Sequence, residues 1–277
     1  MSYSFQKERE FWEQHYNIWD IDLPTVSLQQ DSQTFRIVTP FYNCQDYLRL
    51  YLYSISIQKN QNFTVHIVDD CSTDLSVNVI QQIVAHDNRY NLSCNVDKKY
   101  ALQNIVHAID SIEDIRDEDI IILLDGDDWL SCDRVLSHLE FVYSHNNSLM
   151  TYGSYSFFPF KGKGVEPSEY PEFIVQNNLY RKDIWRASHL RTFKYDLWKR
   201  LNYDDLKLND EYLKYAYDQA IMLPLLEMSR EKAFYIPEVL HVYNRTNPLN
   251  VDKIKRREQE QCANYIRNKQ PYERAFT

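Results

Sequence analysis

The feature that most constrains the fold is residues 120–130, IIILLDGDDWL, where an aliphatic run ends at three carboxylates. A short apolar run bounded by turn residues is typical of a buried strand in a parallel sheet. Ligands of such sheets bind just beyond the carboxyl ends of the strands. Side-chain alternation places Asp125 and Asp127 on one side, where such a pair holds a divalent cation and, through it, a diphosphate. The alternative is an acidic turn that only ends a strand.

The chain before and around this stretch alternates between strand-like and helix-like segments. Strands are expected at residues 35–39, 63–68, 91–96 and 119–124, and helices at 46–58, 75–85, 100–112 and 133–145. Alternation of this kind predicts an α/β fold with a mostly parallel sheet flanked by helices on both faces.

After residue 148 the pattern changes. An aromatic, strand-like segment at 148–158 is followed by a loop rich in glycine and proline at 161–171. The remaining expectations are helices at 183–201, 210–229 and 252–268, and short strands at 233–236 and 239–243. Residues 1–33 are expected to form a helical extension whose aromatic stripe packs on the main domain.

Composition excludes several classes of function. A net charge of −9 argues against a nucleic-acid backbone as partner, because phosphate binding needs a basic surface. The five cysteines include no CxxC pair, which indicates neither a zinc site nor a disulfide framework and favours a reducing compartment. With no secretory signal and no membrane span, a cytoplasmic location is expected. Glycine-rich phosphate loops are also absent from the sequence.

Three segments in order, VTPFYN (38–43), VDDCSTD (68–74) and LDGDDWL (124–130), resemble the signature segments of family 2 glycosyltransferases with the GT-A fold. The similarity continues more loosely through residues 188–201, 217–228 and 236–250. It implies a single GT-A domain whose residues 34–147 bind a nucleotide sugar. Residues 148–277 would then form a largely helical half that binds the acceptor.

The resemblance also implies an activity. Such enzymes move a sugar from a nucleotide-diphosphate donor, most often a UDP-sugar, to a hydroxyl of a glycan or glycoconjugate. The transfer is inverting and uses Mn²⁺ or Mg²⁺, here held by Asp127 and Asp125. Nucleotide-sugar contacts are implied for Pro40, Tyr42, Asp69, Asp70, Lys98, Lys99, Asp125, Gly126, Asp128 and Trp129.

Several of these residues have a structural alternative. Asp70 is equally suited to an Asx turn or a helix N-cap, and Lys98 and Lys99 to solvated surface charge. Trp129 either walls the sugar pocket or packs in the core. The sequence also departs from the family at Cys71, which replaces the glycine of DDGS, and at Lys99, which stands near another family glycine.

Inverting transfer needs a carboxylate that takes the proton of the acceptor hydroxyl. The family carries this base as the Asp of an ED-like motif that opens a helix, which matches Asp218, although Tyr217 replaces the Glu. Asp204, Asp205, Asp210 and Glu211 are weaker candidates and suit helix caps or surface acids better. His189, Arg191 and Arg245 are expected to contact phosphate or acceptor. His241 suits a packed core histidine better than a further metal ligand.

Two other functions compete with this interpretation. The first is a non-catalytic nucleotide-sugar or glycan-binding protein that retains the fold, favoured by the altered ED motif and the missing glycines. The second is an aspartate-dependent phosphotransferase, disfavoured because Trp129 stands where that chemistry places Thr or Val. The donor sugar, the acceptor and the oligomeric state stay open.

Overall fold

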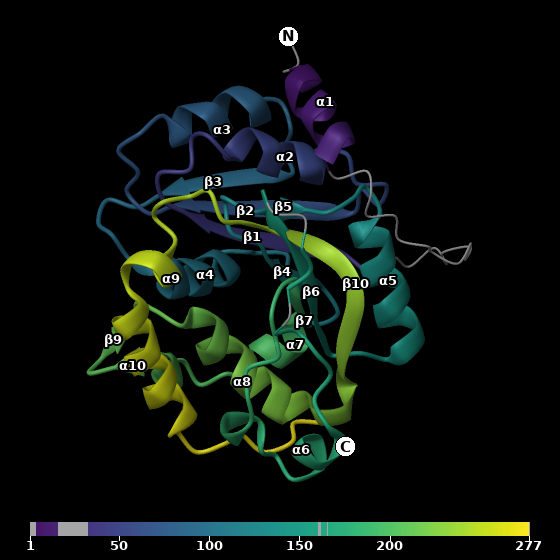
Figure 1. Ribbon diagram of the computed structural model, residues 1–277, viewed down its shortest axis with the longest axis vertical. Coiled ribbons are helices and arrows are strands. Elements are labelled where there is room, and N and C mark those ends of the chain that lie inside the picture. Colours follow the sequence, from purple (N-terminus) through teal and green to yellow (C-terminus); the bar gives the residue numbers. More distant parts are fainter. Residues whose placement is uncertain (1–3, 16–32, 160–161, 165, 277) are drawn as a thin grey trace.

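The computed structural model describes residues 4–15, 33–159, 162–164 and 166–276. Its central element is an eight-stranded sheet of order β3-β2-β1-β4-β7-β6-β10-β5 (Figure 1). The strands are β1 (Phe35–Phe41), β2 (Phe63–Asp69), β3 (Tyr90–Cys94), β4 (Ile120–Leu123), β5 (Trp129–Leu130), β6 (Met150–Phe158), β7 (Arg191–Lys194) and β10 (Ala233–Asn244). A separate hairpin pairs β8 (Lys207–Leu208) with β9 (Glu211–Tyr212).

Helices cover both faces of the sheet. One apolar core lies under α1 (Gln6–His15), α2 (Leu48–Ser56), α3 (Ser76–Val84) and α5 (Val135–Asn146). The other lies under α4 (Tyr100–Asp110), α7 (Tyr195–Trp198), α8 (Tyr217–Ser229) and α10 (Arg256–Arg267). The short helices α6 (Glu172–Gln176) and α9 (Val251–Ile254) complete the set. Among the described residues, no helix is long and apolar enough to cross a membrane.

The sheet has a parallel half and a mixed half that meet at β4. Strands β3, β2, β1 and β4 are all parallel, as the sequence predicts. β7 then pairs antiparallel with both β4 and β6. β4 therefore has a parallel neighbour on one side and an antiparallel neighbour on the other, so its carboxyl end faces segments from both halves of the chain.

The predicted helix at 183–201 is wrong. The segment contains the strand β7 and then a four-residue helix, α7. β7 fills the place between β4 and β6, and its buried Thr192 and Phe193 face the two cores. Tertiary pairing overrides the local helical pattern here, because a gap between these strands would leave backbone donors and acceptors unpaired.

Other boundaries also differ from the expectation. The helix expected at 210–229 begins only at Tyr217, since Glu211–Tyr212 belongs to the β8–β9 hairpin. The two short strands near residue 237 are one strand, β10, with irregular pairing between Ile236 and Val239, where Pro237 has no N–H to donate. The expected helix at 252–268 is interrupted at Lys255, between α9 and α10.

The described part of the N-terminal extension packs on α2. Trp12 is buried and meets Tyr53 edge-on at a ring distance of 6.2 Å, and Phe5 lies 5.5 Å from the same ring. Tyr16 and Trp19, which the aromatic stripe includes, lie outside the described residues.

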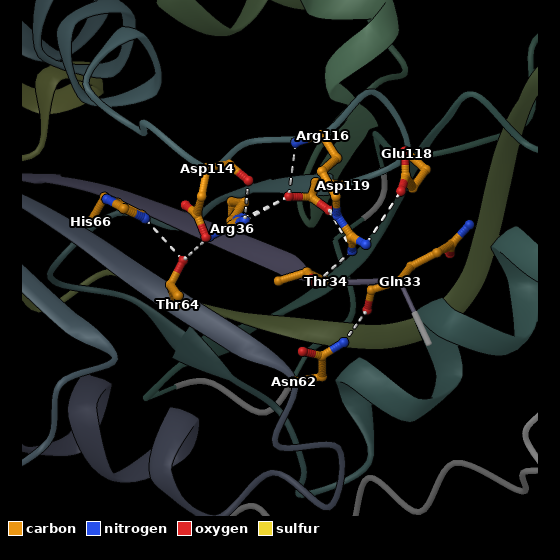
Figure 2. A network of polar contacts seen from close by, with 10 residues as sticks. All are labelled: Gln33, Thr34, Arg36, Asn62, Thr64, His66, Asp114, Arg116, Glu118 and Asp119. Atoms are coloured by element: carbon orange, nitrogen blue, oxygen red, sulfur yellow. Dashed lines mark hydrogen bonds and ion pairs between the residues drawn. The ribbon is translucent and has the colours of Figure 1, made fainter. Parts of the chain in front are cut away.

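A buried ion pair anchors the amino end of the parallel strands (Figure 2). This is the end of β4 opposite the acidic motif. Arg36 on β1 donates to Asp119 at 2.8 Å, and Asp119, just before β4, is 0% exposed. Arg36 also contacts Thr64 on β2 and Asp114. Arg116 adds a second cation to Asp119 at 3.2 Å. The pair ties β1 to the start of β4 and so helps to set where β4 ends.

Replacing Arg36 by Met is expected to lower the free energy of unfolding by about 3 kcal/mol, because Asp119 loses its main buried counter-ion. Urea unfolding measures the change. The matched control is Asp114→Asn, which removes an Arg36 partner whose side chain is 80% exposed and should cost less than about 1 kcal/mol. Equal losses in the two variants would show that burial does not strengthen the Arg36–Asp119 pair.

Candidate active site

A cavity of about 800 Å³ opens beyond the carboxyl end of β4. Its walls come from the end of β1, the start of α4, the acidic motif, β6, β7, the start of α8 and the segment after β10. Of the residues that the sequence singles out, those that line the cavity are Pro40, Tyr42, Asp70, Lys98, Asp125, Asp127, Asp128, His189, Arg191, Asp218 and Arg245.

Four expected nucleotide-sugar contacts are not part of this lining. Asp69 is buried and its carboxylate accepts the backbone N–H of Ser72 at 3.0 Å, so it closes the turn after β2. Lys99 contributes a backbone N–H to Asp70 at 2.7 Å, while the neighbouring Lys98 side chain lines the cavity. In both residues a backbone turn accounts for the contact seen, and motif spacing does not reveal that geometry.

Gly126 and Trp129 are the other two expected nucleotide-sugar contacts outside the cavity lining. A Cβ on Gly126 would lie 2.6 Å from the Cβ of Phe41, so glycine lets the acidic motif pack against the end of β1. Trp129 is 1% exposed and packs its ring 5.4 Å from Phe158, which agrees with the core alternative rather than a pocket wall.

Asp70 lines the cavity and holds the start of α4 through hydrogen bonds. Its carboxylate accepts the backbone N–H groups of Lys99 at 2.7 Å and Tyr100 at 3.1 Å, at the start of α4. Asp70 therefore holds the start of α4 from outside the helix, since Lys99 and not Asp70 is the N-cap residue. Lys98 lies 3.1 Å above the ring of Tyr42, and burial lowers the pKa of its ammonium group. Both side chains line the cavity beside Pro40.

The three acids of the motif lie close together and are poorly solvated. Burial raises the pKa of all three, and for Asp127 the neighbouring carboxylates Asp128 and Asp125 raise it further. Asp125 accepts the hydroxyl of Tyr217 at 2.6 Å, and Asp127 accepts the side-chain amide of Asn247 at 2.7 Å. Carboxylate oxygens held this way suit Mg²⁺ or Mn²⁺, and a divalent cation would offset the mutual repulsion.

Asp128 has a different role in the structure. It is buried, accepts the backbone N–H of Asn244 at 2.8 Å and shares a 2.8 Å hydrogen bond with Nε2 of His241. His241 is fully buried, as the core alternative predicts, and burial lowers its pKa to about 3. Its ring stacks on His189 at 4.3 Å. Asp128, His189 and His241 offer ligand atoms within 4.8 Å of one another, although Arg191 approaches His189.

Arg191 brings a positive charge into this acidic region. It is 4% exposed and opens β7, directly opposite Leu123 of β4. Its guanidinium lies 3.8 Å from the Asp218 carboxylate, 3.5 Å from the hydroxyl of Tyr217 and 3.2 Å from Nε2 of His189. Its Nε finds no hydrogen-bond partner among the described residues. A buried guanidinium beside several carboxylates compensates part of their desolvation.

Asp218 stands in the first turn of α8, where the helix dipole favours a carboxylate. The residue before this helix turn, Ala216, has φ 56° and ψ 34°, a left-handed conformation that costs a non-glycine residue about 1–2 kcal/mol. Neighbouring contacts must therefore hold the start of α8. The weaker candidates for the base lie outside the cavity lining: Asp204, Asp205, Asp210 and Glu211.

Sequence reasoning missed three contributors to the site. Asn247, in the polar segment NRTNPLN after β10, binds Asp127 directly. Tyr217, which in the sequence only marks a departure from the ED motif, donates its hydroxyl to Asp125. Tyr155 and Phe157 alternate along β6 and form an aromatic wall with Tyr243. The sequence signal for this wall is the spacing of Tyr155 and Phe157, which places both side chains on one face of the strand.

Residues 36–201 match the model of glycosyl transferase family 2. The chain belongs to this family. An uncharacterised glycosyltransferase from Haemophilus influenzae is 31% identical over 132 residues, which are 47% of this chain and 50% of that protein. The poly(ribitol-phosphate) β-N-acetylglucosaminyltransferase TarS of Staphylococcus aureus is 24% identical over 215 residues, 73% of this chain and 35% of TarS.

Solved structures agree with the GT-A fold. S. aureus TarS residues 1–349 in complex with UDP-GlcNAc gives a TM-score of 0.60 at 16% identity, covering 78% of this chain and 59% of that one. The Pyrobaculum calidifontis mannosyltransferase in complex with GDP-Man and Mn²⁺ gives 0.55 at 15% identity, covering 97% and 74%. The family 2 resemblance and the predicted fold class are thereby confirmed. This family 2 chain spans half or less of the length of the curated relatives described here.

Replacing Asp127 by Asn is expected to raise the melting temperature of the metal-free protein by a few degrees, because it removes one of three mutually repelling carboxylates. The same variant should lose the rise in melting temperature that Mn²⁺ gives the unaltered protein. Thermal unfolding with Mn²⁺ and with EDTA measures both effects. The control Asp46→Asn changes an exposed acid outside the cavity and should keep the Mn²⁺ response. An unchanged Mn²⁺ response in Asp127→Asn would remove Asp127 from the metal site.

Proposed function

We propose that this chain is a metal-dependent, inverting glycosyltransferase that moves a sugar from a nucleotide-diphosphate donor to an acceptor hydroxyl on a glycan or glycoconjugate. The observation that carries the proposal is that one cavity brings the acidic motif after β4 together with Asp218 at the start of α8. A metal-binding pair and a carboxylate base are the two groups that this reaction requires.

The proposed donor site lies on the side of the parallel strands. Asp127 and Asp125 would hold Mn²⁺ or Mg²⁺, and the bound ion would neutralise charge on the leaving diphosphate. Pro40, Tyr42, Asp70 and Lys98, which line the same cavity, would surround the nucleoside. A UDP-sugar is the proposed donor. One structural relative has bound UDP-GlcNAc and another has bound GDP-Man with Mn²⁺. They support a nucleotide-sugar donor but do not decide between uracil and guanine as its nucleobase.

The proposed chemistry is a direct displacement at the anomeric carbon. Asp218 takes the proton of the acceptor hydroxyl while the new C–O bond forms and the bond to the diphosphate breaks. His189, Arg191 and Arg245 line the same cavity as Asp218 and would contact the acceptor or the leaving phosphate. The aromatic faces of Tyr155, Phe157 and Tyr243 suit the apolar faces of sugar rings.

A non-catalytic binding protein is the second candidate, because Tyr217 replaces the acid that the family places before its base. The two functions differ in turnover. An enzyme releases a nucleoside diphosphate from one of a panel of nucleotide sugars in the presence of Mn²⁺, whereas a binding protein is stabilised by the nucleotide sugar but leaves it intact.

Asp218→Asn is expected to lower the rate of sugar transfer at least about 100-fold, because an amide cannot take the acceptor proton. The nucleotide-dependent rise in melting temperature should persist, since the donor site is unchanged. Asp204→Asn is the matched control, an exposed acid outside the cavity that should retain the original rate. Full activity in Asp218→Asn would assign the base to another residue.

A further inference from the structure

The residue just before the proposed base forms a short hydrogen bond to the acidic motif. Tyr217 donates its hydroxyl to the Asp125 carboxylate at 2.6 Å, across 92 residues of chain. The bond connects the first turn of α8 to the acidic motif that follows β4.

Arg191 provides a second link to the same turn. From the start of β7 its guanidinium contacts the hydroxyl of Tyr217 at 3.5 Å and lies 3.8 Å from the Asp218 carboxylate. Because β7 pairs with β4 at Leu123, the backbone at Arg191 is fixed to the strand that ends two residues before Asp125. Three elements, β4, β7 and α8, thus meet around the Tyr217 hydroxyl.

The backbone at this point needs such support. Ala216 adopts a left-handed conformation with φ 56°, which favours glycine, and the helix starts at the next residue. The Ala216 cap makes no side-chain hydrogen bond. Besides the Tyr217–Asp125 bond, the first turn of α8 is held by Arg267, whose Nε donates to Gln219 at 2.9 Å. The Tyr217–Asp125 bond is the contact of this turn that reaches the acidic motif.

We propose that Tyr217 is a positioning residue: its hydrogen bond to Asp125, supported by Arg191, fixes the first turn of α8 and so places Asp218 relative to the donor-binding acids. This inference rests on the proposed function. A tyrosine suits the position because a second carboxylate there would face Asp125, whereas a hydroxyl donates to it. Tyr217, which replaces the Glu of the family's ED motif, thus contacts the acidic motif through a hydroxyl instead of a carboxylate.

Tyr217→Phe removes the hydroxyl and keeps the ring. The rate constant for transfer at saturating donor is expected to fall between about tenfold and a hundredfold, the usual effect of losing a hydrogen bond to a charged group. The KM for the donor should stay within about twofold, because the donor-binding side chains remain. The ratio of transfer to hydrolysis of the donor should also fall, because water needs less exact placement of the base than the acceptor does.

Tyr212→Phe is the matched control. It is the same substitution five residues earlier, in β9 and outside the cavity, and should leave all three quantities unchanged. A second variant, Ala216→Gly, relieves the left-handed strain of the same turn and leaves the Tyr217 hydroxyl in place, so the turn depends less on its contacts. If both act through the placement of α8, the effects of Tyr217→Phe and Ala216→Gly on the transfer rate should be clearly less than additive.

The outcomes separate this inference from the function on which it rests. Wild-type transfer rates in Tyr217→Phe, or full additivity with Ala216→Gly, overturn the positioning role while the enzyme remains a transferase. A large rise in donor KM with an unchanged rate constant also overturns it, because Tyr217 would then serve donor binding. Absence of nucleotide binding and transfer in the unaltered protein overturns the proposed function and this inference with it.

Discussion

The desolvation of three carboxylates at the end of β4 is the constraint on which the rest of the site depends. Acids packed this closely are stable only if hydrogen-bond donors or cations surround them. Each acid has a different donor: Tyr217 for Asp125, Asn247 for Asp127, and His241 with the backbone of Asn244 for Asp128. The segments that carry these donors come from the second half of the chain. Hydrogen bonds to the acidic motif therefore hold α8 and the end of β10 beside the cavity.

The topology of the sheet explains how the acidic motif after β4 contacts residues from both halves of the sheet. β4 pairs in parallel with β1 and antiparallel with β7. Its carboxyl end therefore lies between the parallel half, with Asp70 and Lys98, and the mixed half, with Arg191 and Asp218. At the opposite edge, the buried Arg36–Asp119 pair fixes the start of the same strand (Figure 2). In the proposed mechanism, donor and acceptor would therefore bind on the two sides of a strand whose ends are both held by buried polar contacts.

Sequence reasoning recovered the parallel half because periodicity, turn residues and strand length agree there. It failed where long-range contacts determine the secondary structure or the partner of a side chain. Residues 191–194 form a strand because β4 and β6 leave a place between them, which no local pattern reveals. Asp69 and Trp129 belong to the expected motifs, but turn closure and core packing account for them. The polar contacts of Asn247 and Tyr217 join residues more than 90 positions from their partners, and spacing within a motif carries no information about such pairs.

The most direct test of the central claim is the coupling between Mn²⁺ and a nucleoside diphosphate, measured by calorimetric titration of each ligand in the absence and presence of the other. If Asp125 and Asp127 hold a cation that in turn holds the diphosphate, each ligand tightens the binding of the other by the same factor. The account predicts such reciprocal coupling, about tenfold or more. Nucleotide binding of equal strength with Mn²⁺ and with EDTA would contradict the metal-bridged site, and with it the proposed role of the acidic motif.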